Sequence, residues 1–334
     1  MATASWSTLK LDSSPVDRSS HSISSYQAEG ATHVVLMGGE HEARTPINSS
    51  LWTYTNGAGE WLPKFVSGGE APSARVAHSQ CIVTQDGTPY LYVFGGRQGI
   101  HMDEAPLNDL HRFDLVKQTW EAVYTGDDAP PPRSFHRMEA IGDSVFVFAG
   151  CAAKGRLNDL WRFDTVAGVW SQCATNEAIK GRGGPGFCAV GDKLWVVAGF
   201  AGEETDDIYT YDPATDSWEN VEPKGEFRKR SVFGHAAVGK HIVVFGGEVD
   251  PSERGHEGAG GFSNDVMVFD TVARQWHSAS AGEGKLPFAR GWSSMAAIAA
   301  GEKEGTLLVF GGLAGDDEAP QRLDDTCVLE LKID

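Results

Sequence analysis

The sequence predicts an all-β protein assembled from six similar repeats. An apolar run ends in a doublet of two small residues six times along the 334 residues. The doublets begin at Gly38, Gly95, Ala149, Ala198, Gly246 and Gly311. They lie 48 to 65 residues apart, and a period near 50 residues is typical of proteins that repeat one supersecondary unit. Forty glycines and ten tryptophans fit many tight turns and a recurrent aromatic packing position.

Each repeat also contains a strand-like segment that follows the doublet. Apolar and polar residues alternate in these segments, which predicts half-buried strands. Five of them cover residues 51–54, 109–114, 159–164, 207–212 and 265–270, with tryptophans following at 61, 120, 170, 218 and 276. The sixth copy, 325–331, reaches the C-terminus without a tryptophan, whereas Trp6 lies in a similar segment near the N-terminus. We therefore expect an N-terminal strand to complete the last repeat, and residues 1–12 to be needed for stability.

These repeats resemble the Kelch family over nearly the whole chain. The resemblance implies a single domain over residues 1–334. That domain would be a six-bladed Kelch β-propeller with four-stranded blades, closed by the N-terminal strand in the last blade. Most of the repeated glycines and aromatic residues then serve blade packing.

Composition excludes several classes of function. The formal net charge is −18, from 28 Lys plus Arg against 46 Asp plus Glu, which argues against a nucleic-acid partner. No long apolar run or secretion signal is present, so we expect no membrane partner and a cytoplasmic location. Five scattered cysteines predict reduced thiols rather than a disulfide framework or a zinc cage.

One arginine opens each repeat, 12 to 14 residues after the tryptophan. The six are Arg18, Arg75, Arg133, Arg182, Arg230 and Arg290. In a propeller they would surround the mouth of the central channel and bind a small anionic substrate through their planar guanidinium groups. In the alternative interpretation, each arginine pairs with backbone or with an aspartate.

The loop after the fifth doublet is rich in carboxylates and glycine. Residues 248–261 contain Glu248, Asp250, Glu253, His256 and Glu257. Carboxylates with imidazole are typical ligands of iron(II), manganese or zinc, so the loop is a candidate metal site. A solvated acidic loop is the alternative.

Several segments are similar to one subgroup of Kelch proteins, the plant specifier proteins. The segments that read alike include 132–136, 182–186, 194–200, 230–233, 238–248, 256–260 and 290–293. This resemblance implies an iron(II)-dependent, lyase-like protein. Its substrate would be a thiohydroximate-O-sulfate, the glucosinolate aglucone released by a myrosinase-type glucosidase, and its product a nitrile or a related compound.

The resemblance also assigns residues. The family holds iron in a Glu-x-x-x-Asp-x-x-x-His frame, which here falls on Glu248, Ser252 and His256. A hydroxyl is a poor replacement for a carboxylate, so Asp250 or Glu253 are alternative oxygen donors.

Further contacts are expected with the substrate. Arg75 and Arg133 match arginines that hold the sulfate or assist its departure, and Trp292 matches a pocket aromatic. Together with the remaining channel arginines, the predicted substrate-binding residues are Arg182, Arg230, Arg290 and Trp292.

Two other classes of function fit a Kelch ring. A non-catalytic propeller would use the same face to bind a protein partner. A copper-radical oxidase fits less well, because such enzymes normally have seven blades, a secretion signal and flanking domains, none of which is visible in the sequence.

Overall fold

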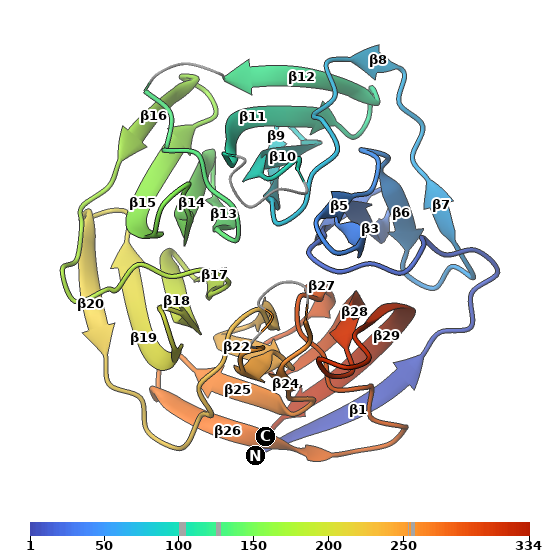
Figure 1. Cartoon of the computed structure of the whole chain (residues 1–334), viewed down its shortest axis with the longest axis vertical. Helices are drawn as coiled ribbons and strands as arrows, with labels where there is room; N and C mark the ends of the chain where they lie inside the picture. The colour runs from blue at the N-terminus through green and yellow to red at the C-terminus, as the bar shows by residue number, and fades with distance from the viewer. Residues whose placement is uncertain (100–104, 125–127, 253, 255–257) are drawn as a thin grey trace.

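The structure is a computed structural model that describes residues 1–334 except 100–104, 125–127, 253 and 255–257. Its described residues form β-strands and connecting turns, with no helix among them. Figure 1 shows the sheets arranged around a central axis, with the two ends of the chain side by side. The protein is therefore an all-β, propeller-like ring. Within the described part, no helix could span a membrane.

The strands form four separate large sheets and one joined sheet. The first sheet has the order β2 (Ser22–Ala28), β3 (Ala31–Met37), β6 (Trp52–Thr55), β7 (Trp61–Pro63). The second contains β9 (Ser79–Gln85), β10 (Thr88–Gly96), β11 (Leu107–Asp114) and β12 (Thr119–Tyr124), with β8 (Gly68–Gly69) beside β12. The third contains β13 (Arg137–Ile141), β14 (Ser144–Cys151), β15 (Arg156–Asp164) and β16 (Val169–Gln172). The fourth contains β17 (Gly186–Val190), β18 (Lys193–Phe200), β19 (Glu204–Asp212) and β20 (Ser217–Val221).

The fifth sheet has eight strands and contains both chain ends. Its order is β21 (Gly234–Val238), β22 (His241–Phe245), β25 (Val266–Asp270), β26 (Gln275–Ala281), β1 (Ala2–Thr8), β29 (Gln321–Ile333), β28 (Glu304–Ala314), β27 (Ser294–Ala300). Strand β1 is antiparallel to β29 and parallel to β26. The Trp6 ring packs 4.6 Å from the Phe245 ring, between centroids.

Two hairpins lie after doublets: β4 (Glu40–Glu42) with β5 (Thr45–Pro46), and β23 (Glu248–Asp250) with β24 (Gly261–Phe262). The first strands of the repeats contact one another in a closed cycle, in the order β2, β9, β13, β17, β21 and β27. These strands surround the central channel.

The core lies between neighbouring sheets. One cluster, for example, joins Phe94 of the second sheet to Val147 of the third. The doublets allow this close packing: Gly38 has φ +67°, and a Cβ there would lie 2.6 Å from His78 Cε1 and 2.7 Å from the carbonyl oxygen of Arg75. All five cysteines are free, as expected from their spacing.

Candidate functional site

A ring of backbone hydrogen bonds narrows the channel at one end. In each repeat, the residue two positions after the repeated arginine adopts a left-handed conformation, with φ between +48° and +57°. These residues, which we call the throat, are Ser20, Ala77, Phe135, Gly184, Val232 and Trp292. Each N–H donates to the carbonyl of the preceding member, and Ser20 donates to Trp292, at distances of 2.8 to 3.0 Å. The throat therefore closes on itself and uses its own backbone donors and acceptors.

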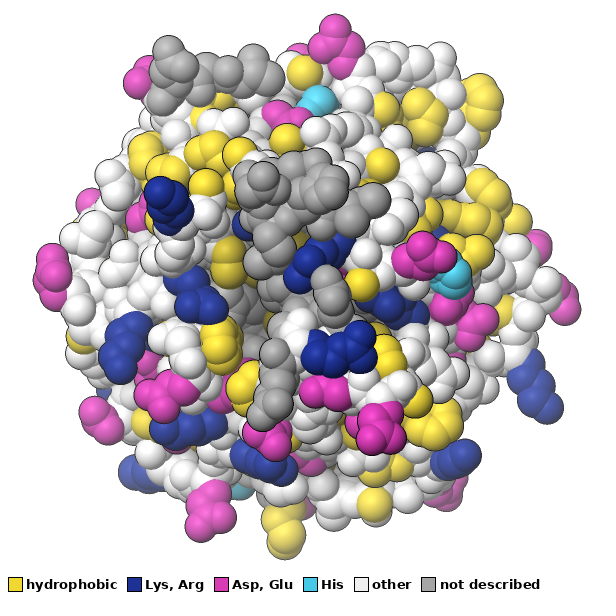
Figure 2. Space-filling view, viewed as in Figure 1, with side chains coloured by type: hydrophobic (Ala, Val, Ile, Leu, Met, Phe, Trp, Pro, Cys, Tyr) yellow, Lys and Arg dark blue, Asp and Glu magenta, His cyan; other side chains and the backbone are white. Residues whose placement is uncertain are grey.

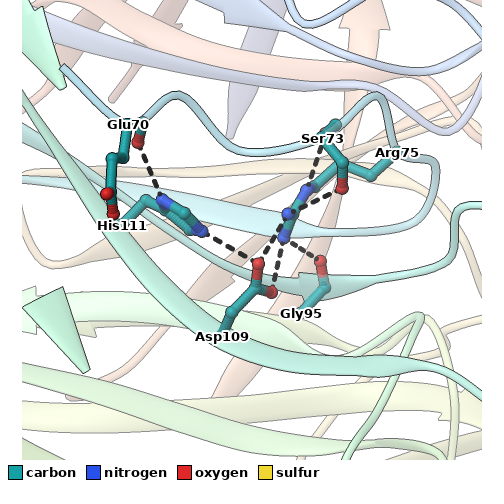
Figure 3. A network of polar contacts seen from close by, with 6 residues as sticks. All are labelled: Glu70, Ser73, Arg75, Gly95, Asp109 and His111. Atoms are coloured by element: carbon teal, nitrogen blue, oxygen red, sulfur yellow. Dashed lines mark hydrogen bonds and ion pairs between the residues drawn. The ribbon is translucent and has the colours of Figure 1, made fainter. Parts of the chain in front are cut away.

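The six repeated arginines lie behind the throat and are buried. Five of them form paired contacts with an aspartate of the same repeat: Asp109, Asp159, Asp207, Asp265 and Asp325. Figure 3 shows the pattern at Arg75, which bonds Asp109 through both terminal nitrogens, at 2.9 and 2.8 Å, and also bonds the carbonyl of Gly95. His111 Nε2 lies 2.9 Å from the same carboxylate. Arg18 bonds only backbone carbonyls, those of Val16 and Gly38, among the described residues.

This arrangement favours the alternative interpretation of the arginines. The exposed fraction of Arg75, Arg133, Arg182, Arg230 and Arg290 is 0%. Each guanidinium neutralises an aspartate and binds the carbonyl of the doublet's first residue, so it joins the strands of one repeat. In this structure these guanidinium groups have no surface exposed to solvent. A direct role for them in substrate binding or catalysis stays a prediction from resemblance.

Two adjoining cavities lie above the throat, on the face that carries the loops after the doublets. We call this the doublet face. The upper cavity, of about 180 Å³, is bounded by Phe135, Phe200, Trp292, Glu248 and Ser252, among others. The lateral cavity, of about 260 Å³, shares Phe135, Cys151 and Arg156 with it. Trp292, which the resemblance assigns as a pocket aromatic, lines the upper cavity, and its contact with a substrate stays a prediction.

The cations at these cavities are not the repeated arginines. Arg97 and Arg44 line the lateral cavity, and Arg156 lines both. The Arg156 guanidinium carbon lies 4.5 Å from the centroid of the Phe200 ring, a cation–π contact. Arg97 Nε donates to Ser134 Oγ at 3.0 Å. In Figure 2, Lys and Arg side chains lie around the middle of this face, interspersed with Asp and Glu.

Two buried glutamates meet beside the upper cavity. Glu248 follows the fifth doublet and Glu204 begins β19, and each has an exposed fraction of 6%. Ser231 Oγ donates to Glu204 Oε1 at 3.2 Å, while Glu204 Oε2 has no partner among the described residues. Burial, assisted by the neighbouring Glu248 charge, raises the pKa of Glu204 to about 8. Burial, with contributions from Asp317 and Asp250, raises the pKa of Glu248 to about 7.

The Ser252 hydroxyl forms a hydrogen bond with a carboxylate from another repeat. Its Oγ donates to Asp317, in the loop after the sixth doublet, and its N–H donates to Glu248 Oε1 at 3.3 Å. Arg254 Nη1 donates to the carbonyl of Asp317 at 2.5 Å. The structure thus adds Asp317 as a carboxylate at Ser252; Asp250 and Glu253 as alternative oxygen donors stay predictions.

The predicted metal ligands are only partly within the described residues. Glu248 and Ser252 are adjacent, whereas His256 and Glu253 lie outside the described part of the chain. Among the residues that the structure describes, no three His, Cys, Asp or Glu side chains converge closely enough to hold a metal. Glu248 fits a ligand role as a buried carboxylate on a cavity wall; the Ser252 hydroxyl is already bonded to Asp317.

Sequence comparison gives the relationship of this ring to known proteins. A family model described as KLHDC2/KLHL20/DRC7 Kelch-repeats domain matches residues 20–247. The chain belongs to the Kelch family. This Kelch protein is 34% identical over 325 residues to N-(sulfonatooxy)prop-2-enimidothioate sulfolyase from Thlaspi arvense, covering 89% of each chain. The predicted resemblance to plant specifier proteins is thus confirmed.

Two further relatives are less similar than the sulfolyase. Human Kelch domain-containing protein 3 is 26% identical over 238 residues, which cover 66% of this chain and 60% of the relative. Leucine-zipper-like transcriptional regulator 1 from Pongo abelii is 28% identical over 277 residues, covering 79% of this chain and 30% of the relative.

Sequence reasoning missed Arg97, Arg156, Glu204 and Asp317. A signal was available for the first: the residue after each doublet varies between repeats, with only glutamate occurring twice, and five of the six line the two cavities. These residues are Glu40, Arg97, Cys151, Phe200, Glu248 and Leu313.

The buried glutamates predict how stability depends on pH. The folded pKa of Glu204 is about 8 and that of Glu139, in the channel, is about 7, both above the ordinary 4.5. Between about pH 5 and 8 these two glutamates bind more protons in the folded state than in the unfolded state, so their own contribution to the unfolding free energy falls as pH rises. Buried histidines such as His78 and His235, whose pKa burial lowers to about 3, act in the opposite direction below about pH 6.5. Arginine contacts hold the pKa of aspartates such as Asp207 low, so their contribution is also lost at acid pH.

Urea unfolding of the metal-free protein across this pH range measures the effect. Glu204→Gln should stabilise the protein by about 1–3 kcal/mol at pH 8 and little at pH 5. Glu203→Gln, at an exposed neighbour, is the matched control and should change neither value. Equal behaviour of the two variants at pH 8 would contradict the raised pKa of Glu204.

Proposed function

We propose that the doublet face carries the active site of a specifier-like, metal-dependent lyase acting on a small anionic sulfur compound. The carrying observation is the pair of adjoining cavities, which has a carboxylate side at Glu248 and a cationic side at Arg97 and Arg156, with aromatic walls between them. The likeness to the Thlaspi arvense sulfolyase supports a substrate of the thiohydroximate-O-sulfate class.

In this proposal, residues of different charge bind different parts of the site: Glu248 and His256 the metal, and the arginines the sulfate. Glu248 and His256 would hold iron(II), which supplies an acceptor for a thiolate sulfur. Arg156 and Arg97 would bind the sulfate group and neutralise its charge as it leaves. Phe135, Phe200 and Trp292 exclude water around the substrate, which strengthens both contacts.

Their positions make Arg156 and Arg97 better candidates for sulfate contact than Arg75 and Arg133. The former line the cavities, whereas the latter have no exposed surface and are already bonded to aspartates. We assign Arg75, Arg133, Arg182, Arg230 and Arg290 to holding the repeats that carry the site.

We also infer that residues 1–334 form one domain of six four-stranded blades, with β1 as the outermost strand of the sixth. The pairing of β1 with β29, the cycle of six inner strands and the six-member throat support this count. A cytoplasmic location and functional coupling to a myrosinase-type glucosidase complete the proposal.

Iron binding and product analysis test the function. Anaerobic calorimetric titration with iron(II) should show binding to the wild type, with at least a 10-fold weaker dissociation constant after Glu248→Gln or His256→Ala. His277→Ala, at a histidine on β26, is the control. With myrosinase-treated glucosinolate, Arg156→Gln should lower nitrile formation about 10²-fold or more, as expected for a group that stabilises developing charge. A wild type that neither binds iron(II) nor alters the products would refute the proposal.

A second candidate function is that of a protein-binding propeller. It is favoured by the relatives whose names give no enzymatic activity, Kelch domain-containing protein 3 and leucine-zipper-like transcriptional regulator 1. It would use the same doublet face. Partner capture that is lost in Arg156→Gln and unaffected by a metal chelator would support it over the lyase.

A further inference from the structure

A third cavity lies on the other side of the throat, inside the central channel. Its volume is about 260 Å³, and its lining includes Ser22, Gln80, Arg137, Glu139, His235 and Ser294. Within the described part of the chain, a void of about 30 Å³, bounded by throat residues and by Arg137, lies between this channel cavity and the doublet face. The channel cavity is therefore a compartment separate from the proposed active site.

Arg137 is a large, charged residue at a repeated channel position that elsewhere holds serine or glycine. Ser22 of the first repeat donates from Oγ to the carbonyl of His78 in the next repeat, at 3.0 Å. At the equivalent point of the third repeat, Arg137 Nε donates to the carbonyl of Pro185 at 2.8 Å. The equivalent residues elsewhere are Ser79, Gly186, Gly234 and Ser294. Contact between repeats thus needs only a short side chain or none, and the guanidinium is an addition.

The added charge is not neutralised. Apart from the bond to Pro185, Arg137 has no hydrogen-bond or acidic partner among the described residues. Its terminal nitrogens can therefore be used by a molecule in the cavity that Arg137 lines. Burial lowers the pKa of Arg137 to about 10, so it remains cationic at neutral pH. A half-buried charge without a partner is costly, and an oxyanion would offset that cost.

The other titratable groups on the channel wall, Glu139 and His235, do not pair with the Arg137 guanidinium. Glu139 lies two residues further along β13, about 7 Å away along the strand, and its Oε1 accepts from the N–H of Ala140 at 3.0 Å. His235 Nε2 lies between the backbone N–H and carbonyl of Phe187, at 3.1 and 3.0 Å. Burial and the Arg137 charge lower the pKa of His235 to about 3, so it is neutral.

We propose that the channel cavity is a binding site for a small oxyanion of the sulfate or phosphate type, held by the terminal nitrogens of Arg137. The guanidinium fork matches two oxygens of such an anion. This site lies outside the proposed active site, because the throat separates them.

Calorimetric titration with sulfate and with inorganic phosphate, at constant ionic strength set by chloride, tests the proposal. We expect Arg137→Gln to weaken anion binding at least 10-fold. Arg162→Gln, which removes an arginine from the outer part of the same sheet, should leave it unchanged. Equal binding by the wild type and Arg137→Gln, or no binding by the wild type, overturns the proposal.

Two further variants cover the remaining outcomes. At pH 8, above its pKa of about 7, Glu139 is negatively charged. Glu139→Gln removes this charge from the channel and should tighten binding about 3-fold to 10-fold at that pH; an unchanged dissociation constant counts against the channel even if Arg137→Gln does not fold. Arg156→Gln should retain the channel site. Loss of binding in Arg156→Gln alone would assign the anion to the doublet face and also overturn the proposal.

Discussion

Removal of residues 1–12 should leave the chain unable to maintain its ring. The deletion removes β1, whose residues 2–8 pair with residues 327–333 of β29 and also contact β26. It also removes Ala2, Ala4 and Trp6 from the core cluster that joins β22, β25, β28 and β29. The loss should exceed the net stability of a typical domain, about 5–15 kcal/mol. Circular dichroism and size-exclusion chromatography should show an unfolded or aggregated chain.

A smaller change gives a graded version of the same test. Trp6→Ala should cost about 3–5 kcal/mol in urea unfolding, because it empties a buried aromatic position. Val116→Ala, at a residue with an exposed fraction of 65%, is the control and should cost little. If a peptide of residues 1–12 is supplied in trans, the deleted chain should regain its fold. A deleted chain with the wild-type unfolding midpoint would show that β1 is dispensable.

Asp159→Ala should destabilise the protein by about 3–5 kcal/mol, because it leaves the Arg133 charge buried without its partner. Asp159 accepts from both terminal nitrogens of Arg133, at 2.8 and 2.9 Å, and from Trp161 Nε1 at 2.7 Å. Asp192→Ala, at an exposed aspartate, is the matched control. Urea unfolding measures both.

The double variant Arg133→Met with Asp159→Leu separates structure from catalysis. Replacing a buried ion pair by apolar side chains is often close to neutral, so this variant should recover most of the stability lost in Asp159→Ala. If Arg133 only joins strands, the folded double variant should also retain activity. A stable double variant without activity would restore the sequence-based role of Arg133 at the substrate.

The repeat pattern predicted the strands because each repeat has the same packing problem. Each repeat packs against its neighbours through a small-residue doublet, alternating strands and a tryptophan at a similar distance. Because similar residues recur at these positions, the pattern can be recognised without a structure. The displaced Trp6 is visible for the same reason. Regular recurrence is a property of the fold.

The same regularity gives the repeated arginines a structural explanation, while their predicted role at the substrate stays a prediction. Six arginines at one position suggest a shared anion, yet their recurrence reflects the pairing of each arginine with a doublet carbonyl and, in five repeats, an aspartate. Asp317 could not be predicted at Ser252, because 65 residues separate them and only the folding of the ring brings the two loops together. Arg137 was hidden in the same way, since its neighbours in the channel come from other repeats.

The throat has a consequence for how such a ring can change its ligand. Its backbone geometry is held by hydrogen bonds between main-chain groups, and residues as different as Gly184, Val232 and Trp292 adopt the same left-handed conformation. The side chains at these six positions can therefore be exchanged while the supporting bonds stay in place. The backbone at the floor of the cavities thus stays the same while the side chains that line them vary. Single substitutions at the throat can therefore change the ligand preference and leave the ring intact.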